Sequence, residues 1–242
     1  MFDFKGKKAI VTGSTQGIGF AIAKALYDAG AEVWVHGATS EEKAKNAAQR
    51  IGCKNYVVKN LADRDAAEVI YNATGDLDIV VLNASVQFRK SWDEITRDEL
   101  DTQISVNFAA TLSMMQKYFP HMKEQNYGRI LTVGSVQQYK PHVDMAVYAA
   151  SKDAQMSIVR NVAKQVAPYG ITVNNLGPGV IATPRNDAAL ADPEYNKKVM
   201  AGIPAGYAGL AEDCAPAALY LCSEEARYVT GSEIIVDGGM HL

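Results

Sequence analysis

The chain has 242 residues, of which 48% are hydrophobic and 21% are charged, and its formal net charge at pH 7 is −3. These proportions are typical of a soluble globular protein and exclude disordered or collagen-like chains. The slight negative charge gives no electrostatic reason to expect a nucleic acid partner. Cys53, Cys214 and Cys222 lack metal-ligand spacing, so we expect neither a disulfide framework nor a bound metal.

The first residues, MFDFKGKK, lead directly into an apolar strand pattern, without the apolar stretch of a signal peptide. No apolar run approaches the length of about 18 residues that a membrane-spanning helix needs. We therefore expect a cytoplasmic protein with no membrane partner.

Short apolar runs of strand length alternate along the chain with stretches of helical character. The predicted strands are 9–11, 33–35, 56–58, 79–82, 130–133, 171–173 and 234–236. The predicted helices include 17–29, 41–51, 63–73, 97–123 and 148–167. This alternation predicts an α/β fold in which a doubly wound parallel sheet of about seven strands is flanked by helices.

No linker, repeat or low-complexity block interrupts the alternation, so residues 1–242 are expected to form a single domain. The segment 183–210 departs from the rhythm, with Pro184, Pro193 and Pro204 around a short helical stretch at 193–200. Insertions near the carboxyl ends of strands often cover a substrate, and an inert surface excursion is the alternative.

The segment Thr12 to Gly19, TGSTQGIG, follows the first predicted strand and opens the first predicted helix. Glycines at such a turn let the backbone approach a pyrophosphate, and the helix N-terminus favours negative charge. The spacing is G-x-x-x-G-x-G, which differs from the common G-x-G-x-x-G of dinucleotide-binding folds. The motif alone predicts either a phosphate-binding turn or a structural one.

Tyr148 and Lys152 stand four residues apart and therefore share one face of a predicted helix. A neighbouring ammonium favours the phenolate form of a tyrosine, so the pair can move a proton. Ser135 follows the strand 130–133 and Gly134, at a carboxyl strand end where ligands bind in such folds. Alone, each has a simpler interpretation, as a surface pair and as a serine that satisfies the backbone.

Taken together, these motifs resemble those of the short-chain dehydrogenase/reductase family in order and separation. The elements that carry the resemblance are the glycine segment, Asn107 in Val106-Asn107-Phe108, Ser135, Tyr148 with Lys152, Pro178-Gly179 and the ending Val236-Asp237-Gly238-Gly239. The resemblance covers essentially the whole chain. It implies a Rossmann-fold oxidoreductase that transfers a hydride between NAD(P) and an alcohol or ketone. It also implies a homotetramer in which helices 97–123 and 148–167 pack across one interface.

The resemblance assigns a role to each of four catalytic residues. Tyr148 exchanges a proton with the substrate oxygen, and Ser135 orients and polarises that oxygen. Lys152 binds the nicotinamide ribose and lowers the pKa of the tyrosine. Asn107 holds a water that links Lys152 to solvent.

The resemblance also implies a set of residues along the bound NAD or NADP. They are Gly13, Thr15, Gln16, Gly17, Ile18, Gly19, His36, Thr39, Asn60, Leu61, Asn83, Ala84, Tyr148, Lys152, Pro178, Gly179, Ile181 and Thr183. Two positions depart from the family pattern. Ser85 stands where glycine is frequent, and Asn60 stands where many members carry an aspartate near the adenine.

The choice between the two cofactors depends on the end of the second predicted strand. Gly37 occupies the place of the acidic residue that would repel a 2′-phosphate, which removes an obstacle to NADP. Basic residues that often bind this phosphate are absent, with Gln16 and Ala38 in their places. Thr39, Ser40 or a protonated His36 is expected to help, so the sequence leans slightly toward NADP.

Residues near the catalytic groups in sequence are mostly polar and are expected to face the substrate: Gln87, Gln137, Gln138, Lys140, His142, Met145, Arg185 and Asn186. Since buried polar groups need partners, such a pocket suits a polyol, sugar or sugar acid. A solvated rim is the alternative.

Two other functions are compatible with the motifs. One is a 3-oxoacyl-acyl-carrier-protein reductase, for which Arg129 offers basic surface to an acidic carrier, although Tyr169 stands where a basic residue is frequent. The other is a non-catalytic protein that senses the cofactor, since a fold does not imply a function. The complete catalytic set argues against the second.

Overall fold

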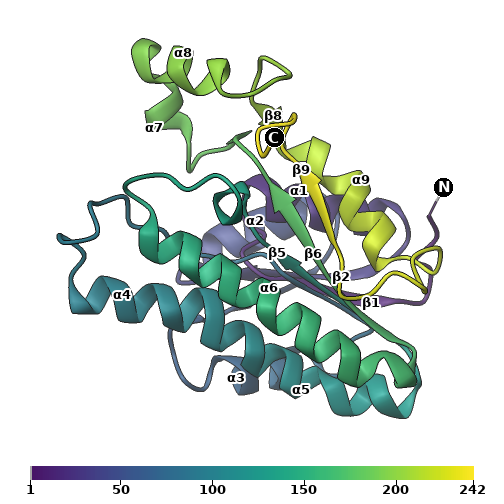
Figure 1. Cartoon of the computed structure of the whole chain (residues 1–242). Helices are drawn as coiled ribbons and strands as arrows, with labels where there is room; N and C mark the ends of the chain where they lie inside the picture. Colours follow the sequence, from purple (N-terminus) through teal and green to yellow (C-terminus); the bar gives the residue numbers. More distant parts are fainter. Residues whose placement is uncertain (1) are drawn as a thin grey trace.

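The computed structural model describes residues 2–242 and is built on one parallel sheet of seven strands in the order β3-β2-β1-β4-β5-β6-β9 (Figure 1). The strands are β1 (Lys8–Val11), β2 (Glu32–Gly37), β3 (Asn55–Val58), β4 (Ile79–Leu82), β5 (Gly128–Val133), β6 (Ile171–Pro178) and β9 (Glu233–Val236). From β1 the strands run through β2 to β3 at one edge of the sheet, and from β4 through β5 and β6 to β9 at the other, so the strand order reverses beside β1. Ligands bind at such a switch point, beyond the carboxyl ends of the strands.

Helices cover both faces of the sheet. They are α1 (Gly17–Asp28), α2 (Glu41–Ile51), α3 (Ala66–Thr74), α4 (Arg97–Ile104), α5 (Ala110–Glu124), α6 (Ala146–Val166) and α9 (Ala211–Cys222). Figure 1 shows α1, α2 and α9 on one face and α3, α4, α5 and α6 on the other. The doubly wound α/β prediction is therefore confirmed.

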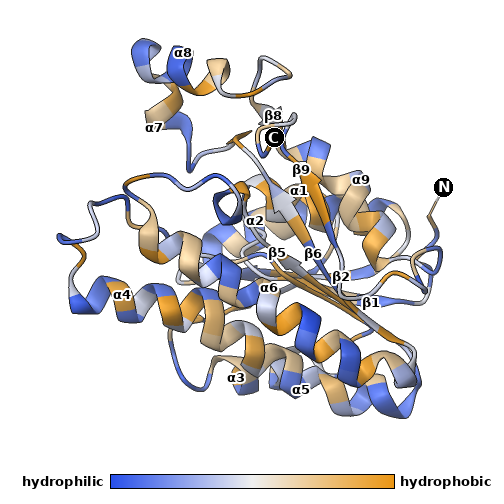
Figure 2. Ribbon diagram, viewed as in Figure 1, coloured by the Kyte–Doolittle hydropathy of each residue, from blue (hydrophilic) through white to orange (hydrophobic). Residues whose placement is uncertain are grey.

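Each face of the sheet has its own apolar core because successive strand residues point to opposite sides. In β4, Ile79 and Val81 belong to the core under α1, α2 and α9, whereas Val80 and Leu82 belong to the core under α3, α5 and α6. Each of these side chains contributes roughly 1.5–3 kcal/mol through burial. The hydropathy colouring in Figure 2 shows the strands as the hydrophobic centre and hydrophilic residues on the outer turns of the helices.

Beyond small shifts at element ends, two predicted elements differ from the observed ones, and one observed helix was not predicted. The predicted helix 97–123 is interrupted by a π turn at Ser105–Ala109, where the side chain of Asn107 bonds to the backbone of Val86. β6 continues past residue 173 because Asn174 and Asn175, although polar, are buried and hydrogen-bonded, Asn174 to the carbonyl of Val229 and Asn175 to the hydroxyl of Thr132 on β5. Helix α9 lies outside the predicted helices.

The segment 183–210 forms a small cap at the carboxyl ends of the strands (Figure 1). It contains α7 (Asp187–Leu190) and α8 (Pro193–Ala201), and β7 (Ile181–Ala182) pairs with β8 (Gly209–Leu210) at its base. Helix α8 begins where the side chain of Asp192 accepts hydrogen bonds from the N–H groups of Glu194 and Tyr195. These two donors of the first turn would otherwise have no acceptor within the helix. Within residues 2–242, no helix has the length and apolarity to cross a membrane.

Candidate active site

A cavity of about 470 Å³ lies at the carboxyl ends of the strands, between the glycine turn and helices α7 and α8. Most of the residues expected to bind the cofactor line it: Gly13, Thr15, Gln16, Gly17, Ile18, Gly19, His36, Asn60, Leu61, Asn83, Ala84, Tyr148, Pro178, Gly179, Ile181 and Thr183. Ser135 also lines it, as do six of the residues expected near the substrate: Gln87, Gln137, His142, Met145, Arg185 and Asn186. The fold therefore gathers segments from across the chain around one space.

The glycine turn is held so close to the end of β4 that neither Gly13 nor Gly19 has room for a side chain. Gly13 has φ +64°, and a Cβ there would lie 2.9 Å from Cα of Ala84. A Cβ on Gly19 would lie 2.6 Å from the carbonyl oxygen of Gly13. Nδ2 of Asn83 donates to the carbonyls of Thr12 and Gly13 at 2.8 and 3.1 Å, which fixes the turn against the end of β4.

This bare turn fits the pyrophosphate of a dinucleotide. Helix α1 begins directly after it at Gly17 and has no acidic residue in its first turn. Among the described residues that line the cavity, none is an aspartate or glutamate. Backbone N–H groups at a helix N-terminus, with no nearby carboxylate, form a favourable site for phosphate.

His36 holds this turn in place through a hydrogen bond and is uncharged at neutral pH. Its Nδ1 accepts a hydrogen bond from the N–H of Gly13 at 3.0 Å, so Nε2 carries the ring proton and donates to the carbonyl of Lys59 at 2.9 Å. Burial lowers the pKa of His36 to about 4, against the small opposing effect of the Lys59 carbonyl. The expectation of a protonated His36 beside a 2′-phosphate is therefore wrong.

Tyr148 and Ser135 bring two hydroxyl groups into the cavity from neighbouring elements. Ser135 follows β5, and its N–H donates to Oε1 of Gln138 at 2.9 Å. Its Oγ accepts a hydrogen bond from the N–H of Gln137 at 3.2 Å, so its own proton is free to be donated. Tyr148 lies near the start of α6 and is 6% exposed. Because it lines the cavity, a ligand bound there can contact it, whereas bulk solvent is largely excluded.

Lys152 lies one turn further along α6 and is buried behind Tyr148. Its Nζ is 5.7 Å from the centre of the Tyr148 ring and donates to the carbonyl of Val133 at 2.7 Å. Burial, with a smaller contribution from the charge of Arg185, lowers the pKa of Lys152 to about 7. The amine is therefore poised to change charge near neutral pH.

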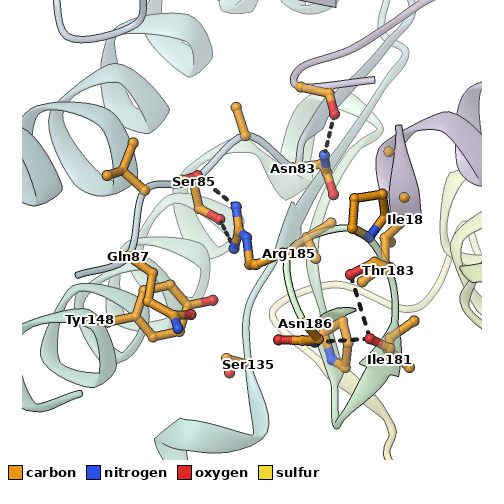
Figure 3. Close-up of a pocket in the computed structure, with 18 of the residues that line it drawn as sticks. Ile18, Asn83, Ser85, Gln87, Ser135, Tyr148, Ile181, Thr183, Arg185 and Asn186 are labelled. Atoms are coloured by element: carbon orange, nitrogen blue, oxygen red, sulfur yellow. Dashed lines mark hydrogen bonds between the residues drawn. The ribbon is translucent and has the colours of Figure 1, made fainter. Parts of the chain in front are cut away.

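Arg185 crosses the cavity from the cap to the loop after β4. Its Nη1 donates to Oγ of Ser85 at 2.9 Å, and its Nη2 donates to the carbonyl of Ser85 at 2.7 Å. Figure 3 shows this guanidinium in the middle of the cavity, with Gln87 and Tyr148 on one side and Thr183 on the other. Ser85, which stands where the family frequently has glycine, thus accepts two hydrogen bonds from Arg185.

Comparison with known proteins agrees with this geometry. A family model described as enoyl-(acyl carrier protein) reductase matches residues 13–241. The 3-oxoacyl-[acyl-carrier-protein] reductase FabG of Aquifex aeolicus is 36% identical, with 98% of each chain covered. The chain belongs to the short-chain dehydrogenase/reductase family. This dehydrogenase/reductase is accordingly an NAD(P)-dependent oxidoreductase that acts on CH–OH groups, and the resemblance seen in the sequence is confirmed.

Solved structures of relatives share the whole fold of this dehydrogenase/reductase. A 3-oxoacyl (acyl-carrier-protein) reductase of Agrobacterium tumefaciens with bound NADP superposes with a TM-score of 0.93 at 34% identity, covering 98% of this chain and 95% of the other. A gluconate 5-dehydrogenase of Burkholderia cenocepacia, in complex with NADP and tartrate, gives a TM-score of 0.91 at 31% identity, covering 99% and 96%.

Several residues that the sequence places near the cofactor or substrate lie elsewhere. Thr39 is exposed and lies outside the cavity lining, and Oγ of Ser40 accepts a hydrogen bond from the N–H of Lys43 at 3.2 Å at the start of α2. Gln138 holds the backbone of Ser135, and Nζ of Lys140 donates to the carbonyls of Gly202 and Met240. Nearness in sequence therefore identifies the correct loop but not which of its side chains point inward.

Sequence reasoning also missed residues that the fold brings to the site. Arg89, from the loop after β4, donates through Nη2 to the hydroxyl of Tyr195 at 3.0 Å, and this Nη2 lies 3.4 Å from Nε2 of His142. Arg89 and Tyr195 both line the cavity but are 106 residues apart. Only the packing of α8 over the loop after β4 reveals the pair.

Proposed function

We propose that this oxidoreductase transfers a hydride between NAD(P) and a hydroxyl or keto carbon of a small polyhydroxylated acid, such as a sugar acid. The observation that carries this proposal is the charge of the cavity. Arg89 and Arg185 line its substrate end, and no carboxylate lines it within residues 2–242. A carboxylate substrate pairs with guanidinium groups through charge-assisted hydrogen bonds, which are about twice as strong as neutral ones.

Arg89 is the better placed of the two for a substrate carboxylate. Its guanidinium is exposed at the mouth of the cavity, 5.1 Å from the centre of the Tyr195 ring. Of its five N–H donors, those on Nη2 face Tyr195 and His142. Stacking on the tyrosine restricts the guanidinium, which lowers the entropy lost when it binds an anion.

The uncharged polar groups of the cavity suit the hydroxyls of such an acid. Oε1 of Gln137 is buried and has no hydrogen-bond partner among the described residues. A buried acceptor without a donor costs about 1–3 kcal/mol, and a hydroxyl on the substrate would remove this cost. Gln87 also lines the cavity and offers both a donor and an acceptor.

The proposed chemistry divides between the cofactor and four side chains. When bound, the nicotinamide supplies or accepts the hydride. Ser135 donates its free proton to the substrate oxygen, and Tyr148 gives that oxygen a proton in reduction or takes it in oxidation. In this proposal, Lys152 favours the phenolate of Tyr148 while its ammonium is charged, and it binds the nicotinamide ribose. Asn107 fixes the wall behind them through its bonds to Val86.

We propose NADP as the preferred cofactor. The end of β2 presents Gly37 and Ala38 to the cavity, and neither repels a 2′-phosphate. NADP is also the cofactor bound to the solved relatives from Agrobacterium tumefaciens and Burkholderia cenocepacia.

A 3-oxoacyl-acyl-carrier-protein reductase is the second candidate, and the 36% identity to FabG of Aquifex aeolicus favours it. The basic residue that the sequence offered for docking an acidic carrier is not on the surface, however. Arg129 is 1% exposed, and its guanidinium donates to the carbonyls of Ser223, Gly128 and Gly170 and to Glu224. Arg129 is therefore a buried structural residue, and its proposed role in carrier docking is wrong.

A paired-substrate assay tests the proposal. Turnover is followed by nicotinamide absorbance with NADP or NAD, using gluconate, glucitol as its uncharged analogue, and an acetoacetyl thioester in the reductive direction. We expect turnover of the acid with NADP. Arg89→Gln should raise KM for the acid by about 10-fold or more, the loss of a charge-assisted hydrogen bond, and leave glucitol kinetics unchanged.

Arg97→Gln is the matched control, because Arg97 is an exposed arginine whose side chain pairs with Asp101 on α4. It should leave both substrates unaffected. Turnover of the thioester alone would reject the sugar-acid proposal in favour of the second candidate. An equal effect of Arg89→Gln on gluconate and glucitol would reject the assignment of Arg89.

A further inference from the structure

A chain of buried hydrogen bonds joins Lys152 to the backbone of Asn107. Nζ of Lys152 donates to Oε1 of Gln155 at 2.9 Å, and Nε2 of Gln155 donates to Oγ1 of Thr111 at 2.8 Å. The hydroxyl of Thr111 donates in turn to the carbonyl of Asn107 at 3.0 Å. Lys152 is 1% exposed and Gln155 is 0% exposed, so bulk water does not compete for these bonds.

The partners on either side fix the orientation of the Gln155 amide: Lys152 donates to it, and Thr111 accepts from it. An ammonium can only donate, so the carbonyl oxygen of the amide must face Lys152 and its NH₂ group must face Thr111. Gln155 lies three residues after Lys152 on α6 and therefore on the same face of the helix. A hydrocarbon side chain there would leave the buried ammonium with one acceptor fewer.

Two of the three N–H bonds of Lys152 are thus assigned, one to Val133 and one to Gln155. The third has no acceptor among residues 2–242. The ammonium is held behind the Tyr148 ring, at 5.7 Å from its centre. The remaining N–H is therefore available to the tyrosine or to a bound ribose.

We propose that Gln155 is a positioning residue that keeps Lys152 in its charged form and directs its third N–H toward Tyr148 and the ribose. The side chains of Gln155 and Thr111 form a fixed link between Lys152 and the backbone carbonyl of Asn107. The inference rests on the proposed roles of Tyr148 and Lys152 and not on the identity of the substrate.

The other groups around Lys152 oppose its charge or are neutral. Burial and the charge of Arg185, from the cap, both lower its pKa, which lies at about 7. Tyr148 is the ionisable neighbour on α6. β5 contributes the carbonyl of Val133, and α5 contributes the hydroxyl of Thr111. Loss of the Gln155 acceptor removes a group that stabilises the charged form, so the pKa of Lys152 should fall further.

Carbon-13 resonances of the lysine Cε atoms measure this pKa directly in the cofactor-free protein. The Lys152 signal is assigned by its disappearance in Lys152→Met. In Gln155→Met, which keeps the side-chain length, we expect the Lys152 midpoint to fall by about one pH unit or more, as for the loss of one hydrogen bond to a charged group. In alcohol oxidation, the pH at which kcat/KM rises should move upward, because Tyr148 loses its cation.

Gln165→Met is the matched control, since Gln165 is an exposed glutamine on the same helix whose amide bonds to the carbonyl of Asn161. It should move neither midpoint. Thr111→Val removes the anchor of the Gln155 amide and should lower the Lys152 midpoint by a smaller amount, whereas Thr111→Ser should restore it. If Gln155→Met does not fold, Thr111→Val takes its place.

An unchanged Lys152 midpoint in the variant tested would overturn the inference. So would a uniform loss of activity at every pH, which is what a purely structural glutamine produces. The titration needs no turnover. It therefore separates this inference from the proposed function, which fails instead if Tyr148→Phe keeps its full activity.

Discussion

His36 carries a hydrogen bond on each ring nitrogen and is only 1% exposed, so the folded protein holds it as a neutral imidazole. Its pKa is about 4 in the fold, against 6.5 for an unperturbed histidine. When the pH falls below 6.5, the unfolded chain therefore binds a proton before the folded one does. The contribution of His36 to stability is complete above this value and is lost progressively as the pH approaches 4.

We expect the loss from His36 to reach roughly 2 kcal/mol between about pH 7 and about pH 5. Urea denaturation of the wild type and His36→Gln at both pH values measures it. The variant should be less stable at neutral pH, because the Gly13 N–H loses its acceptor, but should lose roughly 2 kcal/mol less on acidification. Equal losses in the two proteins would show that His36 is not buried neutral.

At this scale, the residues of the proposed reaction centre are the ones that the sequence can predict. Tyr148 and Lys152 are recognisable because a fixed spacing on one helix carries their chemistry. His36 was placed at the site for the wrong reason, because its charge depends on burial, which the sequence does not reveal. Arg89 and Gln155 could not be found, since their partners come from other segments.

At the scale of elements, the glycine turn between β1 and α1 combines a strained backbone with a close contact. Gly13 and Gly75 have nearly the same φ, +64° and +63°, but a Cβ at Gly75 would have no atom within 4 Å. Gly75, with ψ −155°, lies in a region that is essentially restricted to glycine, so Gly75→Ala measures the cost of a strained backbone without a close contact, about 1–3 kcal/mol. It serves as the control for Gly13→Ala.

We expect Gly13→Ala to cost about 1–3 kcal/mol more than Gly75→Ala, because its Cβ presses on Ala84 and forces the turn away from β4. Cofactor affinity should fall by about 10-fold or more, since the displaced N–H groups can no longer meet the pyrophosphate. Thermal denaturation and fluorescence titration with NADPH measure the two effects. Equal results for the two alanine variants would contradict the account of the turn.

The elements that the sequence predicts best have local signals at both ends. Helix α2 spans the predicted residues 41–51, because Ser40 caps its first turn and Gly52 ends it at φ +100°. Helix α9 lacks such signals: its N-terminal cap is Leu210, and it contains Pro216. The length of β6 depends on the partners of Asn174 and Asn175, which lie on other segments.

At the scale of the whole molecule, the cap and the sheet enclose the cavity together. We propose that residues 1–242 act as one NAD(P)-binding unit in which the segment 183–210 covers the substrate. Besides the backbone bond from Ala205 to Gly238, three side-chain hydrogen bonds attach the cap to the body: Arg185 to Ser85, Arg89 to Tyr195 and Lys140 to Gly202. All three contacts are polar and exposed, which suits a segment that opens for ligand exchange.

The homotetramer stays a prediction at this scale. We expect light scattering to give about four times the chain mass of 26.1 kDa, with the helices α4, α5 and α6 at one interface. Ile104, at the end of α4, is 38% exposed in the single chain and should become protected from solvent in the assembly. A scattering mass equal to that of one chain would contradict this expectation.

The most direct test of the central claim compares the wild type with Tyr148→Phe in NADP-dependent oxidation of the sugar acid, alongside NADPH binding. The variant removes one hydroxyl, so turnover should fall by about 100-fold or more while NADPH affinity stays within a few-fold. Tyr228→Phe, at a fully exposed tyrosine, should behave as the wild type. Full turnover in Tyr148→Phe would contradict the account, because the cavity would then have another source for the proton.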